Sequence, residues 1–388
     1  MFRRWSIRTA IFGLLLACLS VTLQSGARAD EVPTLNKLAF PDLPPGRSYS
    51  FLVIGHAYGR SVSSHNLPHH LPAASLLANV DRLRSLNADF VITLGDVYWR
   101  LETRWVSAFE TMIMDRLGIP FVNAVGNHDI TRYTGNDKVV LDAADYRKRF
   151  GRTYYAFRAG ADLHVVVDTV TSGRSITGAQ KSFVEAQIER ASGDPGIRNV
   201  LFWSHHLLWT QIDPEYRWLK GDPGNWNFKA EIYPLLRQLG KSKNVYWGSG
   251  NFGEPPNISL FYDRREQENL SVFATGIGDT RNDLVLHVTV SDDARVTITP
   301  ISLTGEKLPG VEKFDVAANR EVADEWYGLN WDFLVMKPRL NPPTFFEKFE
   351  IVVGIRYFWH GVVITSAIWL GLIISGLILV LYRRRRSP

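Results

Sequence analysis

Three side chains that can bind a metal ion each follow a short apolar stretch of the sequence. They are Asp96 after residues 90–94, Asn127 after residues 121–125, and His205 after residues 199–203. Apolar stretches of this length are typical of buried strands, and open α/β sheets carry their sites at the carboxyl ends of the strands. A divalent metal ion needs oxygen and nitrogen donors that converge from separate segments, and this pattern supplies them.

The same segments carry motifs that resemble one enzyme family. Gly95-Asp96 comes first, Gly126-Asn127-His128-Asp129 follows, and His205 ends a third apolar stretch. This order resembles the calcineurin-like metallophosphoesterases over roughly residues 50–290, and the Gly-Asn-His-Asp quartet is its most specific part. The resemblance implies a phosphoester hydrolase with two divalent metal ions and a four-layer α/β/β/α sandwich.

The resemblance also implies a role for each matching residue. Asp96 stands where the family has the carboxylate that bridges both metals, and Asn127 and His205 stand where it has ligands of the second metal. His128 matches the histidine that faces the leaving-group oxygen as a general acid. Asp129 matches the residue that orients this histidine.

Two motifs depart from the family pattern. The first motif reads His56-Ala57-Tyr58-Gly59 in place of Asp-x-His-Gly, and the last reads Gly248-Ser249-Gly250-Asn251 in place of Gly-His-x-His. Three ligands of the usual seven are intact, and all three belong to the second metal position. A two-metal clamp is therefore in doubt. A single Mn, Zn or Fe ion with His56 or Asn251 as a supplementary ligand remains open, and so does a site that binds without turnover.

A segment rich in tryptophan, tyrosine, proline and glycine spans residues 209–228. Long irregular segments in compact domains are usually functional, so we expect this one to wall a substrate cleft. The expected cleft residues are Tyr58, His206, Trp209, Trp218 and Trp226. His206 is also the alternative ligand if the register of its strand is displaced by one residue.

A second interpretation is a binding or assembly protein that keeps the fold and has lost the chemistry. Its site would bind an envelope glycan or phosphoglycan through aromatic side chains together with His56, Asp222, Asn251 and Glu254. The missing Asp of the first motif and the missing His pair of the last motif favour this interpretation. A stoichiometric metal would favour the hydrolase.

Both ends of the chain carry apolar segments typical of export and anchoring. Residues 1–29 have an arginine-rich start, an apolar core and Ala27-Arg28-Ala29, as in a secretory signal peptide. A lipoprotein signal at Cys18 or an uncleaved anchor is the alternative. Residues 361–381 are uncharged and long enough to span a bilayer. The Arg383–Arg386 cluster then places the tail in the cytoplasm and the body in an extracytoplasmic, periplasmic location.

Charge excludes one class of partner. Eight of the 44 basic residues lie in the two end segments, which leaves 36 against 39 acidic residues in the rest of the chain. No basic stripe remains to neutralise phosphates, so we expect no nucleic-acid partner. The single cysteine, Cys18, lies in the signal segment, so the body has no disulfide.

Composition and periodicity divide the chain into segments. We expect a signal peptide at 1–29, a proline-rich linker at 30–48, a metallophosphoesterase-like domain at 49–303, a membrane-proximal extension at 304–358, a transmembrane helix at 359–382 and a basic tail at 383–388. The expected helices are 72–86, 101–117, 142–150, 178–191 and 231–239. The expected strands are 50–54, 90–94, 121–125, 154–158, 163–168, 199–203 and 244–247, and residues 272–303 are expected to close the second sheet as antiparallel strands.

Overall fold

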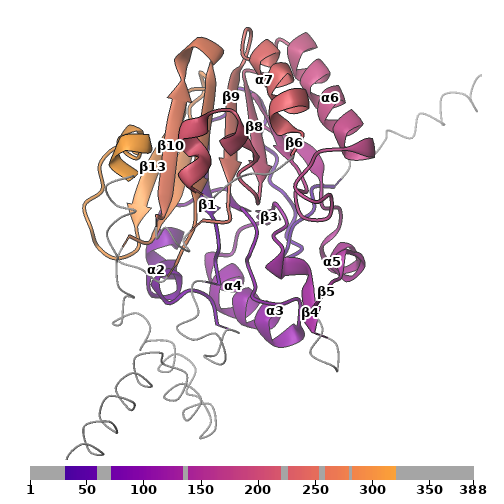
Figure 1. The fold of residues 1–388 in the computed structure, drawn as a ribbon. Coiled ribbons are helices and arrows are strands. Elements are labelled where there is room, and N and C mark those ends of the chain that lie inside the picture. The colour runs from indigo at the N-terminus through magenta and orange to yellow at the C-terminus, as the bar shows by residue number, and fades with distance from the viewer. Residues whose placement is uncertain are drawn as a thin grey trace, which may run out of the picture.

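A computed structural model describes residues 31–58, 71–133, 139–219, 226–252, 258–278 and 282–319. Its two stacked sheets carry helices on their outer faces, with α6 and α7 well apart from α2, α3 and α4 (Figure 1). The helices are α2 (Ala74–Arg84), α3 (Thr103–Phe109), α4 (Asp115–Leu117), α5 (Ala143–Phe150), α6 (Gly178–Gly193) and α7 (Tyr233–Leu239). A π-helical turn, Glu110–Met114, joins α3 to α4, and a second one, Phe228–Ile232, precedes α7.

The first sheet has five strands and is parallel at its site-bearing end. Its order is β13 (Val296–Ser302), β12 (Leu284–Val290), β1 (Tyr49–Ile54), β2 (Phe90–Thr93) and β3 (Phe121–Asn123). β1, β2 and β3 run parallel, whereas β12 pairs antiparallel with both β1 and β13. The carboxyl ends of β1, β2 and β3 therefore meet at one edge.

The second sheet has six strands. Its order is β10 (Leu260–Arg265), β11 (Leu270–Thr275), β9 (Asn244–Ser249), β8 (Asn199–Ser204), β7 (Asp162–Val166) and β6 (Tyr155–Ala159). The four central strands are parallel, and the outer strands β10 and β6 are antiparallel to their neighbours. Short pieces complete the fold: the hairpin β4 (Thr131–Tyr133) and β5 (Val139–Leu141), and 3₁₀ turns at His128–Ile130, Leu208–Gln211, Pro214–Leu219, Glu266–Glu268 and Val311–Lys313.

Alternate residues of the central strands face different layers. In β1, Leu52 and Ile54 join the core beneath α2, α3 and α4. Phe51 and Val53 join a second core that lies between the two sheets. β8 alternates in the same way between this middle core and the core beneath α6 and α7. The predicted mixed α/β sandwich is thereby confirmed, because three apolar cores separate helices, sheet, sheet and helices.

Three expectations need correction. β12 and β13, predicted in the second sheet, extend the first instead, because β12 pairs with β1 and β13 pairs with β12. β11 joins the second sheet, where it runs parallel to β9. Residues 31–48 are not a free linker, because Leu35 and Leu43 are buried in two of the cores and the Leu35 N–H donates to the Phe121 carbonyl at 2.8 Å.

The described part of the extension also packs on the domain. The Phe314 carbonyl accepts the Tyr262 N–H at 2.9 Å, and Leu308, Val311 and Phe314 lie against the middle core. Within the ranges listed above, no helix is long and apolar enough to cross a membrane. The predicted signal segment 1–29 and the predicted span 361–381 lie outside those ranges.

A buried polar chain runs through the middle core and links the two sheets toward the amino ends of β1, β7 and β8. The Trp203 indole N–H donates to His164 Nδ1 at 3.1 Å, so His164 carries its proton on Nε2, which lies 3.2 Å from the Tyr49 hydroxyl. Tyr49 in turn donates to Asp162 Oδ2 at 2.5 Å, and Asn199 donates to the other oxygen at 2.7 Å. Burial raises the pKa of Asp162 to about 6, although both hydrogen bonds lower it.

We expect Tyr49→Phe to destabilise the fold more at pH 7.5 than at pH 4.5. The Tyr49 hydroxyl stabilises the ionised form of Asp162, so its loss raises the pKa of Asp162 in the folded protein further. The resulting loss of stability is present only where Asp162 is ionised in the wild type, above its folded pKa of about 6. The free energy of unfolding should fall by about 3 kcal/mol at pH 7.5 and by about half as much at pH 4.5. Denaturant unfolding of both proteins at the two pH values measures the difference; equal losses would contradict the assignment.

Candidate active site

Three strands are followed by a residue with a left-handed backbone, and each of these residues belongs to the predicted site. They are His56 after β1 (φ 54°), Asp96 after β2 (φ 55°) and Asn251 after β9 (φ 52°). Side chains of these types adopt this conformation more readily than most, at a cost on the order of 1–2 kcal/mol. Such strain is common where the backbone must aim a functional side chain.

Two glycines allow the loops after β2 and β3 to touch. A Cβ atom on Gly126 would lie 2.2 Å from the Asp96 nitrogen and 2.3 Å from its Oδ1 atom. A Cβ atom on Gly95 would lie 2.6 Å from both the Gly126 nitrogen and His205 Nδ1, and Gly95 also has a positive φ of 79°. Only glycine fits at either position, so these residues allow Asp96, Asn127 and His205 to approach one another.

The three intact motif residues converge at the strand ends. His205 Nε2 lies 3.1 Å from Asn127 Oδ1 and 3.5 Å from Asp96 Oδ2. His205 and Asp96 are buried, whereas Asn127 is half-buried. These three side chains, which follow three separate strands, therefore lie together in the structure.

The surroundings of His205 decide which ring nitrogen faces the site. Nδ1 lies 2.9 Å from the Leu94 carbonyl oxygen, which can only accept, so Nδ1 carries the proton of the neutral ring. Nε2 then directs a lone pair at two acceptor oxygens, those of Asp96 and Asn127. A cation bound among the three atoms would satisfy this arrangement. The separations of Nε2 from the two oxygens, 3.1 and 3.5 Å, match those of neighbouring ligands of one ion held at about 2.1 Å, so these donors fit a single metal position.

His56 is a more distant member of the group. Its Nδ1 atom lies 3.0 Å from the Ile277 carbonyl oxygen, and its Nε2 atom faces Asp96 Oδ2 at 3.9 Å. Asn251 follows Gly250, which packs on Leu94, but its side chain makes no hydrogen bond to any described residue. Across the described ranges, no group of three or more His, Cys, Asp and Glu side chains could hold a metal ion. A metal position here therefore depends on the Asn127 amide.

The charge state of Asp96 follows from its neighbours. Burial raises the pKa of this carboxyl, but the three surrounding imidazoles and the His128 N–H outweigh burial, so the pKa lies below its usual value. The His128 N–H donates to Asp96 Oδ1 at 3.0 Å, which leaves Oδ2 directed at His205 and His56. Asp96 is therefore an anion with one oxygen available to a ligand.

His128 lies at the open side of the group. It is half-buried, and its Nδ1 atom is 3.1 Å from the carbonyl oxygen of Trp99. The Trp99 indole stacks on the His128 ring with centroids 4.3 Å apart and planes inclined by 25°. Sequence reasoning missed Trp99. Its available signal was an aromatic residue three positions after Asp96, on the strand-end loop that carries the site.

The sequence predicts that Asp129 orients His128. In the structure, Asp129 instead binds the backbone of two loops and holds them together. Its carboxylate is fully buried and accepts five hydrogen bonds. The donors are the N–H groups of Asp96 (3.1 Å), Val97 (2.7 Å), Tyr98 (3.3 Å) and Gly126 (2.8 Å) and the Asn123 amide (3.2 Å). Burial raises the pKa of Asp129 to about 6, and the adjacent Asp96 carboxylate adds to the rise. The carbonyl of Trp99 takes over the orienting role.

This geometry agrees with a comparison of sequences. Residues 69–251 match the family described as calcineurin-like phosphoesterase. The chain contains a calcineurin-like phosphoesterase domain. Families of this kind generally use divalent metal ions. No curated protein matches the chain significantly.

Solved structures of phosphatases resemble the chain at low identity. A purple acid phosphatase from yellow lupin (Lupinus luteus) seeds is 12% identical, with a TM-score of 0.47 over 70% of this chain and 54% of that one. A dimetal phosphatase from Danio rerio is 12% identical, with a TM-score of 0.44 over 66% of this chain and 96% of that one. The chain thus spans about half the length of the lupin enzyme.

In the two altered motifs, the side chains at the histidine positions have different surroundings. The buried Tyr58 ring packs against the rings of His56 and His128, with centroids 4.2 and 5.1 Å apart. Ser249 is fully buried, and its hydroxyl lies 2.9 Å from that of Ser204 and accepts the Trp209 indole N–H at 3.0 Å. Neither position keeps the imidazole that its motif has in the family.

Two of the expected cleft residues belong to the interior. Trp209 is fully buried and stacks on Phe261 at 5.3 Å, so it does not wall a cleft. His206 is also buried: its Nδ1 atom and its backbone N–H both contact the Thr169 hydroxyl, at 3.0 and 3.1 Å. Burial lowers the pKa of His206 to about 2, so this ring is neutral, and His205 rather than His206 faces Asp96.

Of the other aromatic residues of this segment, the structure describes the side chain of Trp226 but not that of Trp218. Trp226 is half-buried, with the Arg174 guanidinium 5.5 Å from its ring centroid. Asp222, Glu254 and the side chain of Trp218 lie outside the described part of the chain.

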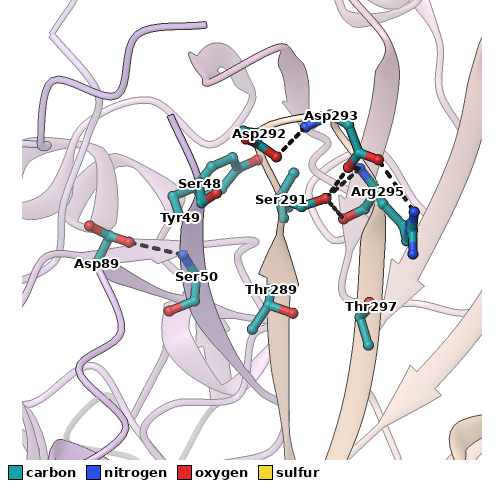
Figure 2. Close-up of a pocket in the computed structure, with 11 residues that line it drawn as sticks. Ser48, Tyr49, Ser50, Asp89, Thr289, Ser291, Asp292, Asp293, Arg295 and Thr297 are labelled. Atoms are coloured by element: carbon teal, nitrogen blue, oxygen red, sulfur yellow. Dashed lines mark hydrogen bonds and ion pairs between the residues drawn. The ribbon is translucent and has the colours of Figure 1, made fainter. Parts of the chain in front are cut away.

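A pocket of about 770 Å³ lies at the opposite edge of the first sheet, where β1 begins and β12 turns into β13. Figure 2 shows that its carboxylates are already engaged: Asp89 accepts the Ser50 N–H, and Asp293 binds Ser291 and Arg295. This pocket is open and polar, and none of the predicted site residues lines it. The candidate site is therefore the strand-end cluster.

We expect Asp129→Asn to destabilise the protein and to reduce activity. The substitution turns one acceptor oxygen into an NH₂ group that would face N–H donors, at a cost of about 2–4 kcal/mol. Denaturant unfolding measures this loss. The matched control is Asp292→Asn on the exposed turn after β12, which should change stability by less than about 0.5 kcal/mol. An Asp129→Asn variant as stable as the wild type would contradict the proposal that Asp129 holds the two loops together.

Proposed function

We propose that the chain is a membrane-anchored, exported phosphoester hydrolase that works with a single divalent metal ion. Asp96, Asn127 and His205 would hold the ion, with His56 as an outer partner. The observation that supports this most strongly is the pair of acceptor oxygens, 3.1 and 3.5 Å away, that the unprotonated Nε2 atom of His205 faces. A bound Mn, Zn or Fe ion would polarise a phosphoryl oxygen and lower the pKa of a bound water.

The chain's own groups divide the remaining work. Asp96 would direct one oxygen at the metal while its other oxygen accepts the His128 N–H, and this would hold His128 beside a bound phosphoryl group. The Trp99 carbonyl occupies His128 Nδ1, so Nε2 is the nitrogen that meets the leaving group. A protonated Nε2 atom would give its proton to the leaving oxygen as the P–O bond breaks. Asp129 holds the loops that carry both residues.

The altered motifs favour one metal over two. The first-motif histidine position is a tyrosine packed among rings, and the first histidine position of the last motif is Ser249 in a closed hydroxyl and indole network. Asp96 would then serve one ion instead of bridging a pair. Whether the chain acts on phosphomonoesters or phosphodiesters depends on groups around the half-exposed side of His128.

A second candidate function is a binding or assembly protein for an envelope glycan or phosphoglycan. The observation that favours it is the same loss of ligands at the first and last motifs. In that case a proton on His205 Nε2 would replace the metal, since an imidazolium would pair with the Asp96 carboxylate at 3.5 Å. Metal content separates the two candidates.

We expect the purified full-length protein to bind about one divalent ion per chain and to hydrolyse simple phosphoesters when supplied with Mn²⁺, Zn²⁺ or Fe²⁺. Asp96→Asn should lose most of the metal and at least about 100-fold in kcat/KM, because it removes the charged ligand. Elemental analysis and a phosphate-release assay measure the two quantities. Asp292→Asn, on the distant turn after β12, is the matched control and should retain both the bound metal and the hydrolytic activity.

Absence of metal and of hydrolysis in the wild-type protein would refute the hydrolase and favour the binding protein. Metal without hydrolysis of any phosphomonoester or phosphodiester would also refute it. Equal loss of activity in Asp96→Asn and Asp292→Asn would show that the loss is unrelated to the site.

The membrane proposal rests on the apolar segment 361–381 and the Arg383–Arg386 cluster. We expect the chain to remain with membranes after washing with carbonate and to be released by truncation before residue 359. Protease added outside the cytoplasmic membrane should degrade the domain but spare a tag at the C-terminus. Protection of the domain would overturn the assigned orientation.

A further inference from the structure

Trp99 contacts the candidate acid His128 with both its backbone and its side chain. Its carbonyl oxygen lies 3.1 Å from His128 Nδ1. Its indole covers the imidazole face with centroids 4.3 Å apart and a 25° angle between planes. The backbone contact selects the tautomer, and the stacked indole restricts rotation of the ring.

Tyr58 supports this pair from a third direction. Its ring centroid lies 5.2 Å from that of Trp99, with the two planes inclined by 77° in an edge-to-face arrangement. The centroid of the His128 ring is 5.1 Å away. Its other neighbour is His56, 4.2 Å away. Tyr58 is buried and Trp99 is half-buried, so the pair forms a wall that is anchored in the interior and reaches the surface beside His128.

His128 needs such support because of its position. It begins a short 3₁₀ turn at a strand end and is itself half-buried, so the backbone alone leaves the ring free to rotate. Proton transfer to a leaving group requires hydrogen-bond distance, and a displacement of about 1 Å can cost roughly 100-fold in rate. The contact with Trp99 restricts the ring before substrate arrives.

We propose that Trp99 is a positioning residue for leaving-group protonation by His128, which rests on the hydrolase function proposed above. In the supported step, water oxygen bonds to phosphorus while the P–O bond to the leaving group breaks. The bond's electron pair stays on the leaving oxygen, which takes the proton from His128 Nε2. The proton released by the attacking water restores His128 through solvent. Trp99 touches neither substrate nor proton and acts through the imidazole.

Leaving groups of different basicity test this role. An alkoxide needs a proton to depart, whereas 4-nitrophenolate hardly does. In Trp99→Ala we expect kcat on an alkyl phosphoester to fall by about 10- to 100-fold and kcat on 4-nitrophenyl phosphate to fall by less than about 3-fold. KM should change little on either. Trp99→Phe, which keeps an aromatic face and the carbonyl, should recover most of the alkyl activity.

A double variant and a measurement without substrate complete the experiment. Adding Trp99→Ala to His128→Ala should cause no further loss, because both changes act on one proton transfer. The ¹⁵N NMR signals of the His128 ring, identified by their absence in His128→Ala, should shift or broaden in Trp99→Ala. The metal content of Trp99→Ala should match that of the wild type, and the variant should remain folded at the assay temperature even though it loses some packing against the core.

Each contrary outcome has a distinct meaning. Equal loss on both substrates, a rise in KM alone, or lost metal would assign Trp99 to substrate binding or to the fold and overturn the proposal. Unchanged His128 ring signals in Trp99→Ala would overturn it without any assay. An inactive wild-type protein would refute the proposed hydrolase, and the ring signals would still decide whether Trp99 holds His128.

Discussion

The candidate site depends on one buried carboxylate. Asp129 accepts N–H groups from the loop after β2 and from the loop after β3, and a buried N–H that lost such a partner would destabilise both loops. Asp96 lies in the first loop and Asn127 in the second. Their approach therefore follows from the position of Asp129, and the glycines at 95 and 126 allow the contact without causing it.

This arrangement has an electrostatic cost. Two carboxyl groups, Asp96 and Asp129, are buried side by side, which raises the pKa of Asp129 to about 6. The imidazoles around Asp96 offset the cost on one side, and a cation at His205 Nε2 would offset more of it.

Backbone carbonyls set the direction of every histidine in the group. Leu94, Ile277 and Trp99 each place a carbonyl oxygen beside an Nδ1 atom, at 2.9, 3.0 and 3.1 Å. The histidines they hold are 205, 56 and 128, and each directs Nε2 away from that contact. Where the family pattern is lost, the space is filled by packing: Tyr58 enters a ring cluster, and Ser249 enters a hydroxyl and indole network. At both altered motif positions, packing and hydrogen bonds among other side chains therefore take the place of the family's histidine.

The sequence by itself determined the donor types, their order and the strands that carry them, because apolar stretches ending in Asp96, Asn127 and His205 require a buried sheet with polar ends. It did not determine that β12 pairs with β1 and β13 with β12, since alternation identifies a strand but not its neighbour. Nor did it reveal that Asp129 binds backbone N–H groups, that Trp99 covers His128 or that Trp209 lies in the core. Those outcomes depend on partners supplied by other segments of the chain, which only the packed tertiary structure brings within hydrogen-bonding or van der Waals distance.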